Sequence, residues 1–260
     1  MEWLHNTVNS LRRQIRAISR LRIGLYAANA SFFITLGAFP GLVLLLGLLR
    51  SSSADPRRLE PLLRGLVPGT LLEGAAALLR SADLSGISLS LSALTAAWSA
   101  GKGVHGILTG LNAVYALEES RGYLKTRLLS GVFTLVLMAA LALILGLRFF
   151  AAAPLLQSPC LKFALPVLLQ TAVSTAMYLS LPNRRTRLRS CLPGALLAAF
   201  GCYGFSALFS VYAAYFAPLT NVYGSLYALA LGMLWLYCCM AIVLLGGAWN
   251  RQLQNRSKKI

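Results

Sequence analysis

The longest stretch without a charged residue limits the fold of this chain more than any other feature. Residues 190–250 contain no Asp, Glu, Lys or Arg. About 20 apolar residues in a helix are enough to cross a hydrocarbon core about 30 Å thick, so this stretch is far too long for one crossing. Residues that break helices cluster in "APLTNVYGS", at Pro218, Asn221 and Gly224. The stretch therefore predicts a helical hairpin in a membrane.

Further apolar runs extend this prediction to the whole chain. Hydrophobic residues make up 57% of it and charged residues 12%, with a mean hydropathy of +0.68. A soluble domain, in contrast, has about 25% charged residues. We predict an all-α polytopic membrane protein with six transmembrane helices and short amphipathic surface helices. The expected spans are residues 25–49, 84–117, 128–150, 163–181, 191–216 and 222–249.

Three segments are expected outside the membrane domain of residues 25–250. Residues 1–24 are predicted as a cytoplasmic amphipathic segment and residues 251–260 as a basic cytoplasmic tail. An extracytoplasmic helical loop is predicted for residues 50–83, between the first two spans. The first run is longer than the core of a signal peptide, which has about 7 to 15 apolar residues, so we expect it to remain as a span.

The distribution of basic residues predicts the orientation. Sixteen Lys and Arg residues lie on the side of the two termini and seven on the opposite side. Basic residues in short segments beside spans stay cytoplasmic, so both termini are expected in the cytoplasm. The net charge of +17 then fits attraction to anionic lipid headgroups, which are the expected partners. No nucleic-acid partner is expected.

A stripe of polar side chains runs along the second expected span. It consists of Thr95, Trp98, Lys102, His105, Thr109 and Asn112, and we call it the polar stripe. Spacings of three and four place these residues on one side of a helix. Polar groups in a membrane helix belong in the bundle interior or beside a water-filled cavity. The alternative is that Lys102 snorkels to the headgroup level and the helix continues into the cytoplasm.

Metal and catalytic chemistry have little support in the sequence. The five cysteines show no C-x-x-C pair, and most fall within expected spans, where a thiol packs as a small apolar group. The two histidines are far apart in sequence, and no acidic residue lies within an expected span. We therefore expect no metal, no cofactor and no enzymatic activity.

Four stretches resemble one family of bacterial inner-membrane proteins. They are "NASFFITLGAFPGLVLLLGLL", "WSAGKGVHGILTGLNAVYALEESRGYLKTRL", "YLSLPNRRTRLRSCLPGALLAAF" and "VYGSLYALALGMLWLYCCMAIVLLGGAWN". In order and spacing they resemble the YihY/BrkB family, which also carries the misassigned name of ribonuclease BN-like family. The resemblance implies six spans and an inner-membrane location. Its recurrent positions fall on Pro40, Asn112, Tyr115, Arg121, Pro182, Asn183, Pro193, Gly194, Tyr223, Gly224, Trp235, Tyr237 and Asn250.

Two positions depart from the family pattern. Gly37 stands where the family often has Ser, and Ala248 stands where the family usually has Glu. The chain therefore lacks the acidic group that a proton-coupled mechanism would use there. A ribonuclease needs clustered metal ligands or an acid/base pair, and the sequence predicts neither, so we do not expect a ribonuclease.

Two hypotheses for the function follow. The first is binding or translocation of an anionic lipid-type or amphipathic substrate in envelope maintenance, passively or driven by a gradient or partner. The candidate binding residues are the stripe members Lys102, His105, Thr109, Asn112 and Trp98, with Asn29, Ser206 and Ser210 as facing partners. The second is a non-transporting scaffold for envelope integrity, with another copy or another membrane protein as partner. Small residues in the spans suit such close helix contacts.

Overall fold

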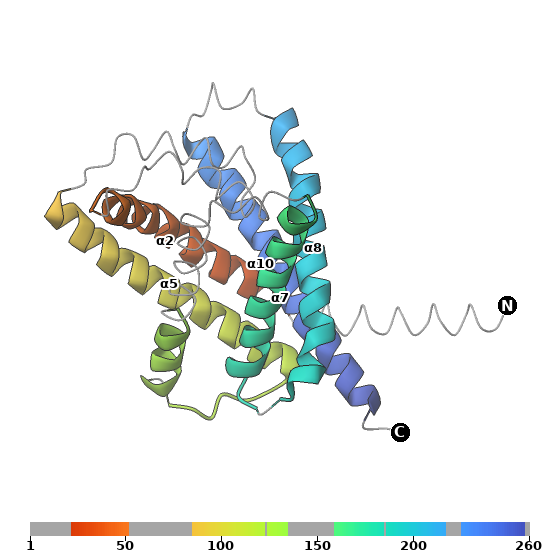
Figure 1. The fold of residues 1–260 in the computed structure, drawn as a ribbon. Helices are drawn as coiled ribbons and strands as arrows, with labels where there is room; N and C mark the ends of the chain where they lie inside the picture. Colours follow the sequence, from red (N-terminus) through yellow and green to blue (C-terminus); the bar gives the residue numbers. More distant parts are fainter. Residues whose placement is uncertain are drawn as a thin grey trace.

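The computed structural model is all-helical over the residues that it describes, which are 22–51, 85–122, 124–134, 159–184, 186–216 and 225–257. These ranges contain no strand. Five helices are labelled in Figure 1: α2 (Ile23–Ser51), α5 (Gly86–Tyr115), α7 (Pro159–Ser180), α8 (Leu188–Tyr215) and α10 (Ser225–Ser257). A further helix covers residues 124–134.

The observed helices lie close to the expected spans. The third span is described only as far as residue 134. The N-terminal segment up to residue 21, residues 52–84 and the predicted hairpin turn at residues 217–224 lie outside the described residues. The sixth helix does not end at residue 249, because α10 continues through Ser257. Most of the expected basic tail is therefore helical, and Arg251 and Gln254 in it hydrogen-bond to other helices.

Capping fixes where α5 begins and ends. At its start the side chain of Ser85 accepts a hydrogen bond from the backbone N–H of Ser88, as expected of an N-cap. At its end Ala116 adopts a left-handed conformation with φ 51°. The backbone N–H of Leu117 then bonds to the Asn112 carbonyl at 2.9 Å, which satisfies a carbonyl that the helix leaves free. The chain turns sharply here into the loop of residues 117–122.

Small residues bring α2 and α5 together. Gly103, Gly106 and Gly110 of α5 face Ile34, Ala30 and Tyr26 of α2, so that the residue numbers rise along one helix and fall along the other. The two helices are therefore antiparallel neighbours (Figure 1). A Cβ on Gly103 would lie 2.7 Å from a side-chain carbon of Ile34. Glycines at this spacing let membrane helices approach closely, and larger residues would separate them.

The two helices expected from the long uncharged stretch pack against each other, whereas the expected turn between them lies outside the described residues. At one end of the pair Gly194 of α8 packs on Gly246 and Asn250 of α10. At the other end the hydroxyl of Tyr227 donates to the carbonyl of Ala213 at 3.3 Å. Helices α8 and α10 are therefore antiparallel and adjacent. Both are long and apolar enough, by length and composition, to cross a membrane.

The core lies where α5, α7, α8 and α10 meet. Tyr178 of α7 is fully buried, and its hydroxyl donates to the carbonyl of Val243 in α10 at 2.5 Å. Leu108 and Leu111 of α5 and Leu244 of α10 are equally buried. In Figure 1, α2 and α5 run obliquely to α7 and α8.

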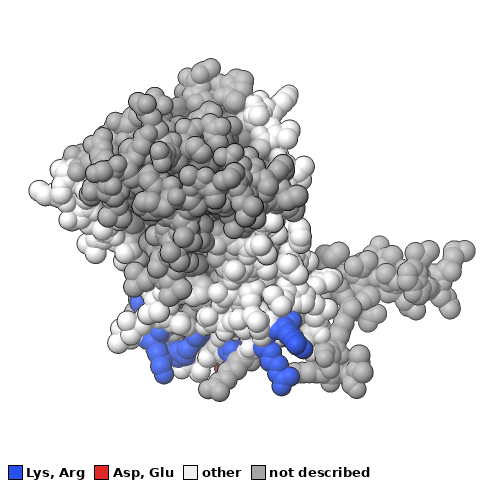
Figure 2. Space-filling model, viewed as in Figure 1, with Lys and Arg blue, Asp and Glu red and all other residues white. Residues whose placement is uncertain are grey.

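Basic side chains gather at one end of the bundle (Figure 2). This end holds the loop after α5, the start of the helix of residues 124–134, the connection from α7 to α8 and the end of α10 (Figure 1). We call it the basic end. Its described basic residues are Arg121, Lys125, Arg127, Arg184, Arg187, Arg189 and Arg251.

Candidate functional site

The polar stripe of α5 divides into two parts that differ in their partners. Near the start of the helix Thr95 is exposed and donates to the carbonyl of Leu91 at 2.8 Å. Trp98 is 50% exposed, whereas Lys102, His105 and Thr109 are half-buried and Asn112 is buried. The stripe therefore runs from the surface into the molecule as it approaches the basic end.

Lys102 lies beside two aromatic rings. Its Nζ is 5.8 Å from the ring centroid of Trp98 and 5.9 Å from that of Phe33 in α2. The two rings meet edge to face with their centroids 5.9 Å apart. Within the described residues the one ion pair joins Arg121 to Glu119, so the Lys102 ammonium has no carboxylate partner there. Cation–π contacts are worth about 0.5–1 kcal/mol at exposed sites and about 2 kcal/mol when desolvated, and they leave the positive charge of Lys102 unneutralised.

His105 and Thr109 stand one and two turns further along α5. The hydroxyl of Thr109 donates within its own helix, to the carbonyls of His105 and Gly106. The Nδ1 atom of His105 is buried and makes no hydrogen bond to a described residue. The charged groups that act on this imidazole are Arg127, in the helix of residues 124–134, Lys102 and the Glu119 carboxylate. Three basic groups and one carboxylate thus share one region of the molecule.

Of the partners expected to face the stripe, Asn29 lies close to it. Its Oδ1 is 2.8 Å from where a Cβ on Gly106 would stand, in the turn between His105 and Thr109. Ser206 and Ser210 belong to the contact of α8 with α10. The Oγ of Ser206 accepts a hydrogen bond from Nε1 of Trp235 at 3.0 Å, and Ser210 donates to the Ser206 carbonyl.

Asn112 is engaged at the basic end and not by the rest of the stripe. Its Nδ2 donates to Oε2 of Glu119 at 2.7 Å, and its Oδ1 accepts from the backbone N–H of Asn183 at 2.9 Å. The side chain of Asn183 donates to Oγ of Ser120 and to the carbonyl of Glu118. We call this cluster, which also includes Arg121, the loop junction, because it joins the loop after α5 to the loop after α7.

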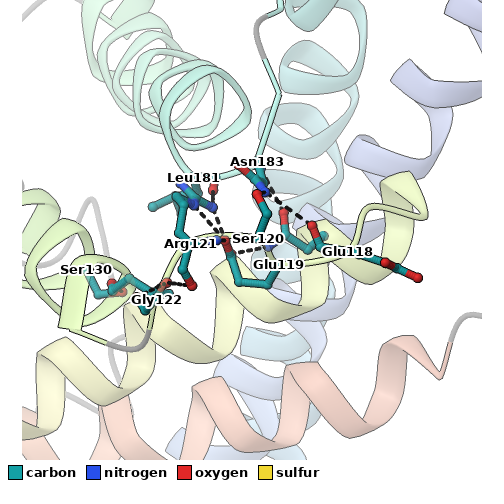
Figure 3. Close-up of polar contacts among 10 residues, drawn as sticks. Glu118, Glu119, Ser120, Arg121, Gly122, Ser130, Leu181 and Asn183 are labelled. Atoms are coloured by element: carbon teal, nitrogen blue, oxygen red, sulfur yellow. Dashed lines mark hydrogen bonds and ion pairs between the residues drawn. The ribbon is translucent and has the colours of Figure 1, made fainter.

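Arg121 binds both oxygens of the Glu119 carboxylate through one edge of its guanidinium. Nε donates to Oε1 at 2.7 Å, and an Nη2 hydrogen bond reaches Oε2 at 2.9 Å. Nη2 also donates to the carbonyl of Leu181 at 2.9 Å, and Figure 3 shows Arg121 pointing toward both Glu119 and Leu181. The hydrogen bonds from Arg121 hold the pKa of Glu119 below its ordinary value, and the Asn112 amide adds to this effect.

Other family positions also make contacts at the basic end. Asn250 of α10 accepts a hydrogen bond from the backbone N–H of Gly194 at 2.7 Å and donates to the carbonyl of Cys191 at 2.9 Å. The guanidinium of Arg184 lies over the ring of Tyr115, 4.4 Å from its centroid. Arg251 donates to the carbonyl of Val114 at 2.7 Å. These contacts tie the ends of α5, α7, α8 and α10 to one another.

The remaining family positions are spread through the helices. Pro40 lies inside α2 and Pro193 inside α8, while Pro182 is buried just after α7. The hydroxyl of Tyr237 lies 3.0 Å from where a Cβ on Gly24 would stand. Tyr223 and Gly224 lie outside the described residues.

Both departures from the family pattern have a physical reason in this fold. A Cβ on Gly37 would lie 2.9 Å from Cβ of Ser99, so a serine there would require α2 and α5 to shift. Ala248 is 2% exposed and belongs to the apolar core. A glutamate at that position would place a carboxylate in the core, which is costly without a partner.

Sequence reasoning missed three residues that bear on this region. Phe33 reads as one more apolar residue of a span, and its contact with Lys102 depends on how α2 packs on α5. In the sequence Arg127 is one of many basic residues near the ends of spans. Glu119 is one of seven acidic residues and stands two positions before Arg121. An acidic residue so close to an arginine, in a chain with few acidic residues, was the sequence signal for an ion pair at this position.

Comparisons with known proteins agree with the resemblance. The chain matches a protein-family model described as "Virulence factor BrkB" over residues 15–259. YfkH of Bacillus subtilis (strain 168), which is named ribonuclease-like, is 28% identical over 248 residues, or 89% of this chain and 90% of YfkH. No solved structure matches the chain.

Two relatives named UPF0761 membrane proteins match a shorter part. The protein of Azotobacter vinelandii is 39% identical over 82 residues, which are 32% of this chain and 20% of that protein. The protein of Rhodospirillum centenum is 35% identical over 86 residues, which are 33% of this chain and 19% of that protein. These matches thus span about a fifth of each relative. With the family match over nearly the whole sequence and the apolar helices of the fold, they show that the chain is a membrane protein of the BrkB family.

Proposed function

We propose that this protein binds an anionic lipid-type substrate and moves it across the membrane, with Lys102 as the contact for the headgroup. The observation that supports this most is the setting of Lys102. It is half-buried beside Trp98 and Phe33, and no described carboxylate neutralises it. A cation beside aromatic rings suits an amphipathic anion, because the rings contact its apolar part while the ammonium attracts the phosphate.

The position of Lys102 along α5 favours this role over snorkelling. Lys102 lies thirteen positions before Tyr115, the last residue of the helix, which corresponds to about 20 Å of helix. With the basic end at the headgroup level, Lys102 lies about 15 Å below that level even at a helix tilt of about 40°. The headgroup region takes up about 5–8 Å of this distance, so Lys102 lies about 7–10 Å inside the hydrocarbon core. A charged residue at such a depth is costly unless it meets water, a partner or a ligand.

The setting in the membrane is part of the proposal. We infer six crossings, the number that the sequence predicts, although the third is described only from residue 124 to residue 134. We place the basic end and both termini in the cytoplasm, in the bacterial inner membrane. The gathering of described basic residues at one end supports this orientation, since such residues stay cytoplasmic and attract anionic headgroups.

We propose no ribonuclease activity, although YfkH is named ribonuclease-like. Two histidines far apart in sequence, in a chain with seven acidic residues, do not suggest an acid/base pair. Glu119, which accepts a hydrogen bond from the stripe residue Asn112, is already paired with Arg121. Metal-dependent degradation of a tRNA precursor by the purified protein would overturn this view.

The scaffold hypothesis loses part of its sequence support. Small residues that suggested contact with partners are used inside the chain: Gly201 packs on Ile242, and Gly246 packs on Gly194 and Tyr178. No contact among the described residues specifically favours a scaffold, which therefore remains the alternative outcome of the following experiment.

The test is reconstitution into liposomes with a fluorescent phosphatidate. We would compare transbilayer movement for the wild type, Lys102→Ala and Lys125→Ala. Lys125 is exposed at the basic end, so its substitution changes the net charge equally without touching the stripe. We expect movement with the wild type and Lys125→Ala, and its loss with Lys102→Ala. Movement no faster than in empty liposomes, with folded wild-type protein, would contradict the proposal and favour the scaffold.

A further inference from the structure

We propose that Arg121 and Asn112 form a second anion-binding site, which the carboxylate of Glu119 fills as an internal ligand in this conformation. The external ligand would be the phosphate of an anionic lipid headgroup. This inference takes its ligand class from the proposed function, but its site is separate from Lys102. The Glu119 side chain would leave when the phosphate binds, so that Arg121 exchanges one anion for another.

The donors around Glu119 are those that a phosphate would use. Each carboxylate oxygen accepts two hydrogen bonds. Oε1 accepts from Nε and from the backbone N–H of Arg121, at 2.7 and 3.1 Å. Oε2 accepts from Nη2 of Arg121 at 2.9 Å and from Nδ2 of Asn112 at 2.7 Å. A guanidinium that binds a carboxylate in this forked manner binds a phosphate in the same way.

These donors are held by contacts that do not involve Glu119. Nη2 of Arg121 also donates to the Leu181 carbonyl, and Asn112 is oriented by the backbone N–H of Asn183. Asn112 belongs to α5, and Leu181 and Asn183 follow α7 directly. Departure of the carboxylate would thus leave donors already in position for another anion. Such preorganisation lowers the free-energy cost of binding.

The Glu119 side chain is the easiest part of the junction to displace. Glu119 lies in the loop after α5, and its side chain is 27% exposed. The loop backbone on either side of it is held separately, because Asn183 bonds to the Glu118 carbonyl and to Ser120. Rotation of one side chain toward solvent would therefore free the donors without moving a helix.

The site lies where the polar stripe reaches the basic end. Asn112 is the last member of the stripe, and its amide donates a hydrogen bond to Glu119. An anion that travels along α5 from Lys102 would therefore reach the junction at Asn112 and Arg121. The competing interpretation is that the Glu119–Arg121 pair only braces the loop.

The experiment measures binding of dihexanoyl phosphatidate to the full chain in phosphatidylcholine nanodiscs by isothermal titration calorimetry. The variants are Glu119→Gln and the matched control Glu118→Gln. Glu118 is exposed and directly precedes Glu119, so the control removes one negative charge from the same loop without touching the Arg121 contact. We expect Glu119→Gln to bind about tenfold more tightly than the wild type, because a charged competitor for Arg121 is gone. Glu118→Gln should bind as the wild type does.

Two further variants complete the test. Arg121→Gln added to Glu119→Gln should abolish the gain, whereas Lys102→Ala added to it should leave the gain in place. These two double variants distinguish a failure of the second anion-binding site at Arg121 from a failure of the proposed headgroup contact at Lys102. If Glu119→Gln does not fold, Glu119→Asp should show a smaller gain, because the shorter carboxylate reaches Arg121 less well.

Equal affinity of the wild type and Glu119→Gln for dihexanoyl phosphatidate would overturn the proposal. The Glu119–Arg121 pair would then serve only to stabilise the loop. An equal gain in Glu118→Gln would also overturn it, since the effect would then be general electrostatics. Inorganic phosphate serves as the second probe. We expect it to bind Glu119→Gln more weakly than dihexanoyl phosphatidate, and equal affinities would overturn the assignment to a lipid headgroup.

Discussion

The loop junction at the basic end and the Lys102 region of α5 both contain polar groups in an apolar protein. The two regions differ in the bonding partners that these groups have. In the junction Asn112, Glu119 and Arg121 each hydrogen-bond to side-chain or backbone partners at 2.7 to 3.1 Å. Around Lys102 the partners are aromatic rings, and the nearby His105 Nδ1 is buried without a described partner. Asn112 of the junction and Lys102 lie on the same helix, α5.

This difference separates polar groups whose partners the chain itself supplies, with Glu119 as the internal partner of Arg121, from polar groups without such partners among the described residues. A polar group with all its partners in place repays the cost of its burial and stabilises one arrangement. A polar group without them is costly, and it persists where a ligand or water completes its bonding. The comparison predicts large effects on stability at the basic end and small ones at Lys102.

The largest effect is expected at the contact between α8 and α10. A Cβ on Gly194 would overlap the carbonyl of Gly246 and lie 2.5 Å from Nδ2 of Asn250. We expect Gly194→Ala to lower the free energy of unfolding by about 3 kcal/mol or more, since backbone atoms cannot move aside cheaply. Gly204→Ala is the control in the same helix, where nothing lies within 4 Å of the new Cβ. Thermal unfolding in detergent measures the stability of both variants. Equal unfolding midpoints for Gly194→Ala and Gly204→Ala would show that α8 and α10 can move apart without loss of stability.

Asn250 should show the next largest effect. Asn250→Ala removes hydrogen bonds to the Gly194 N–H and the Cys191 carbonyl, and it leaves both groups buried without their partner. We expect a loss of about 2–4 kcal/mol in the free energy of unfolding. Asn255→Ala, at an exposed position of the same helix, should change it by less than about 0.5 kcal/mol. A loss below about 1 kcal/mol for Asn250→Ala would mean that water replaces its bonds.

Acidification should weaken the loop junction moderately. The Arg121 hydrogen bonds hold the pKa of Glu119 below its ordinary value of 4.5. A carboxylate with a lowered pKa in the folded state stabilises that state above the ordinary pKa, and the stabilisation is lost as the pH falls through the lowered value. Between about pH 6 and about pH 3 the wild type should lose up to about 1 kcal/mol more than Glu119→Gln, as for a partly exposed pair. Parallel pH profiles of the two proteins would contradict this.

The smallest effect on stability is expected at Lys102. Lys102→Met keeps an unbranched side chain and removes only a charge whose described contacts are two rings. We expect the unfolding midpoint to change by the equivalent of less than about 0.5 kcal/mol, or to rise, because an uncompensated charge is gone. A destabilisation as large as that of Asn250→Ala would make Lys102 a structural residue and remove the difference between the two regions.

The helices were predictable from the sequence because they depend on local composition. Apolar runs and their breakers predicted α2, α5, α7, α8 and α10 to within a few residues at most ends. The extension of α10 was not predictable in this way, because Arg251 and Gln254 are stabilised by partners on other helices.

The candidate site was predictable only in part. Periodicity placed Lys102 and Asn112 on one side of α5, but it could not separate their roles. Asn112 bonds to Asn183, which is 71 residues away and reaches it only through the packing of α5 and α7. The contact of Lys102 with Phe33 likewise depends on the packing of α2 on α5.

Native mass spectrometry of bound lipid would test whether Lys102 holds an anionic headgroup. The wild type, Lys102→Met and Lys125→Met would be purified in the same detergent and offered equal amounts of phosphatidate and phosphatidylcholine. We predict that the wild type and Lys125→Met retain phosphatidate preferentially, and that Lys102→Met loses this preference while staying folded. Equal retention of phosphatidate by all three proteins would contradict a binding role for Lys102.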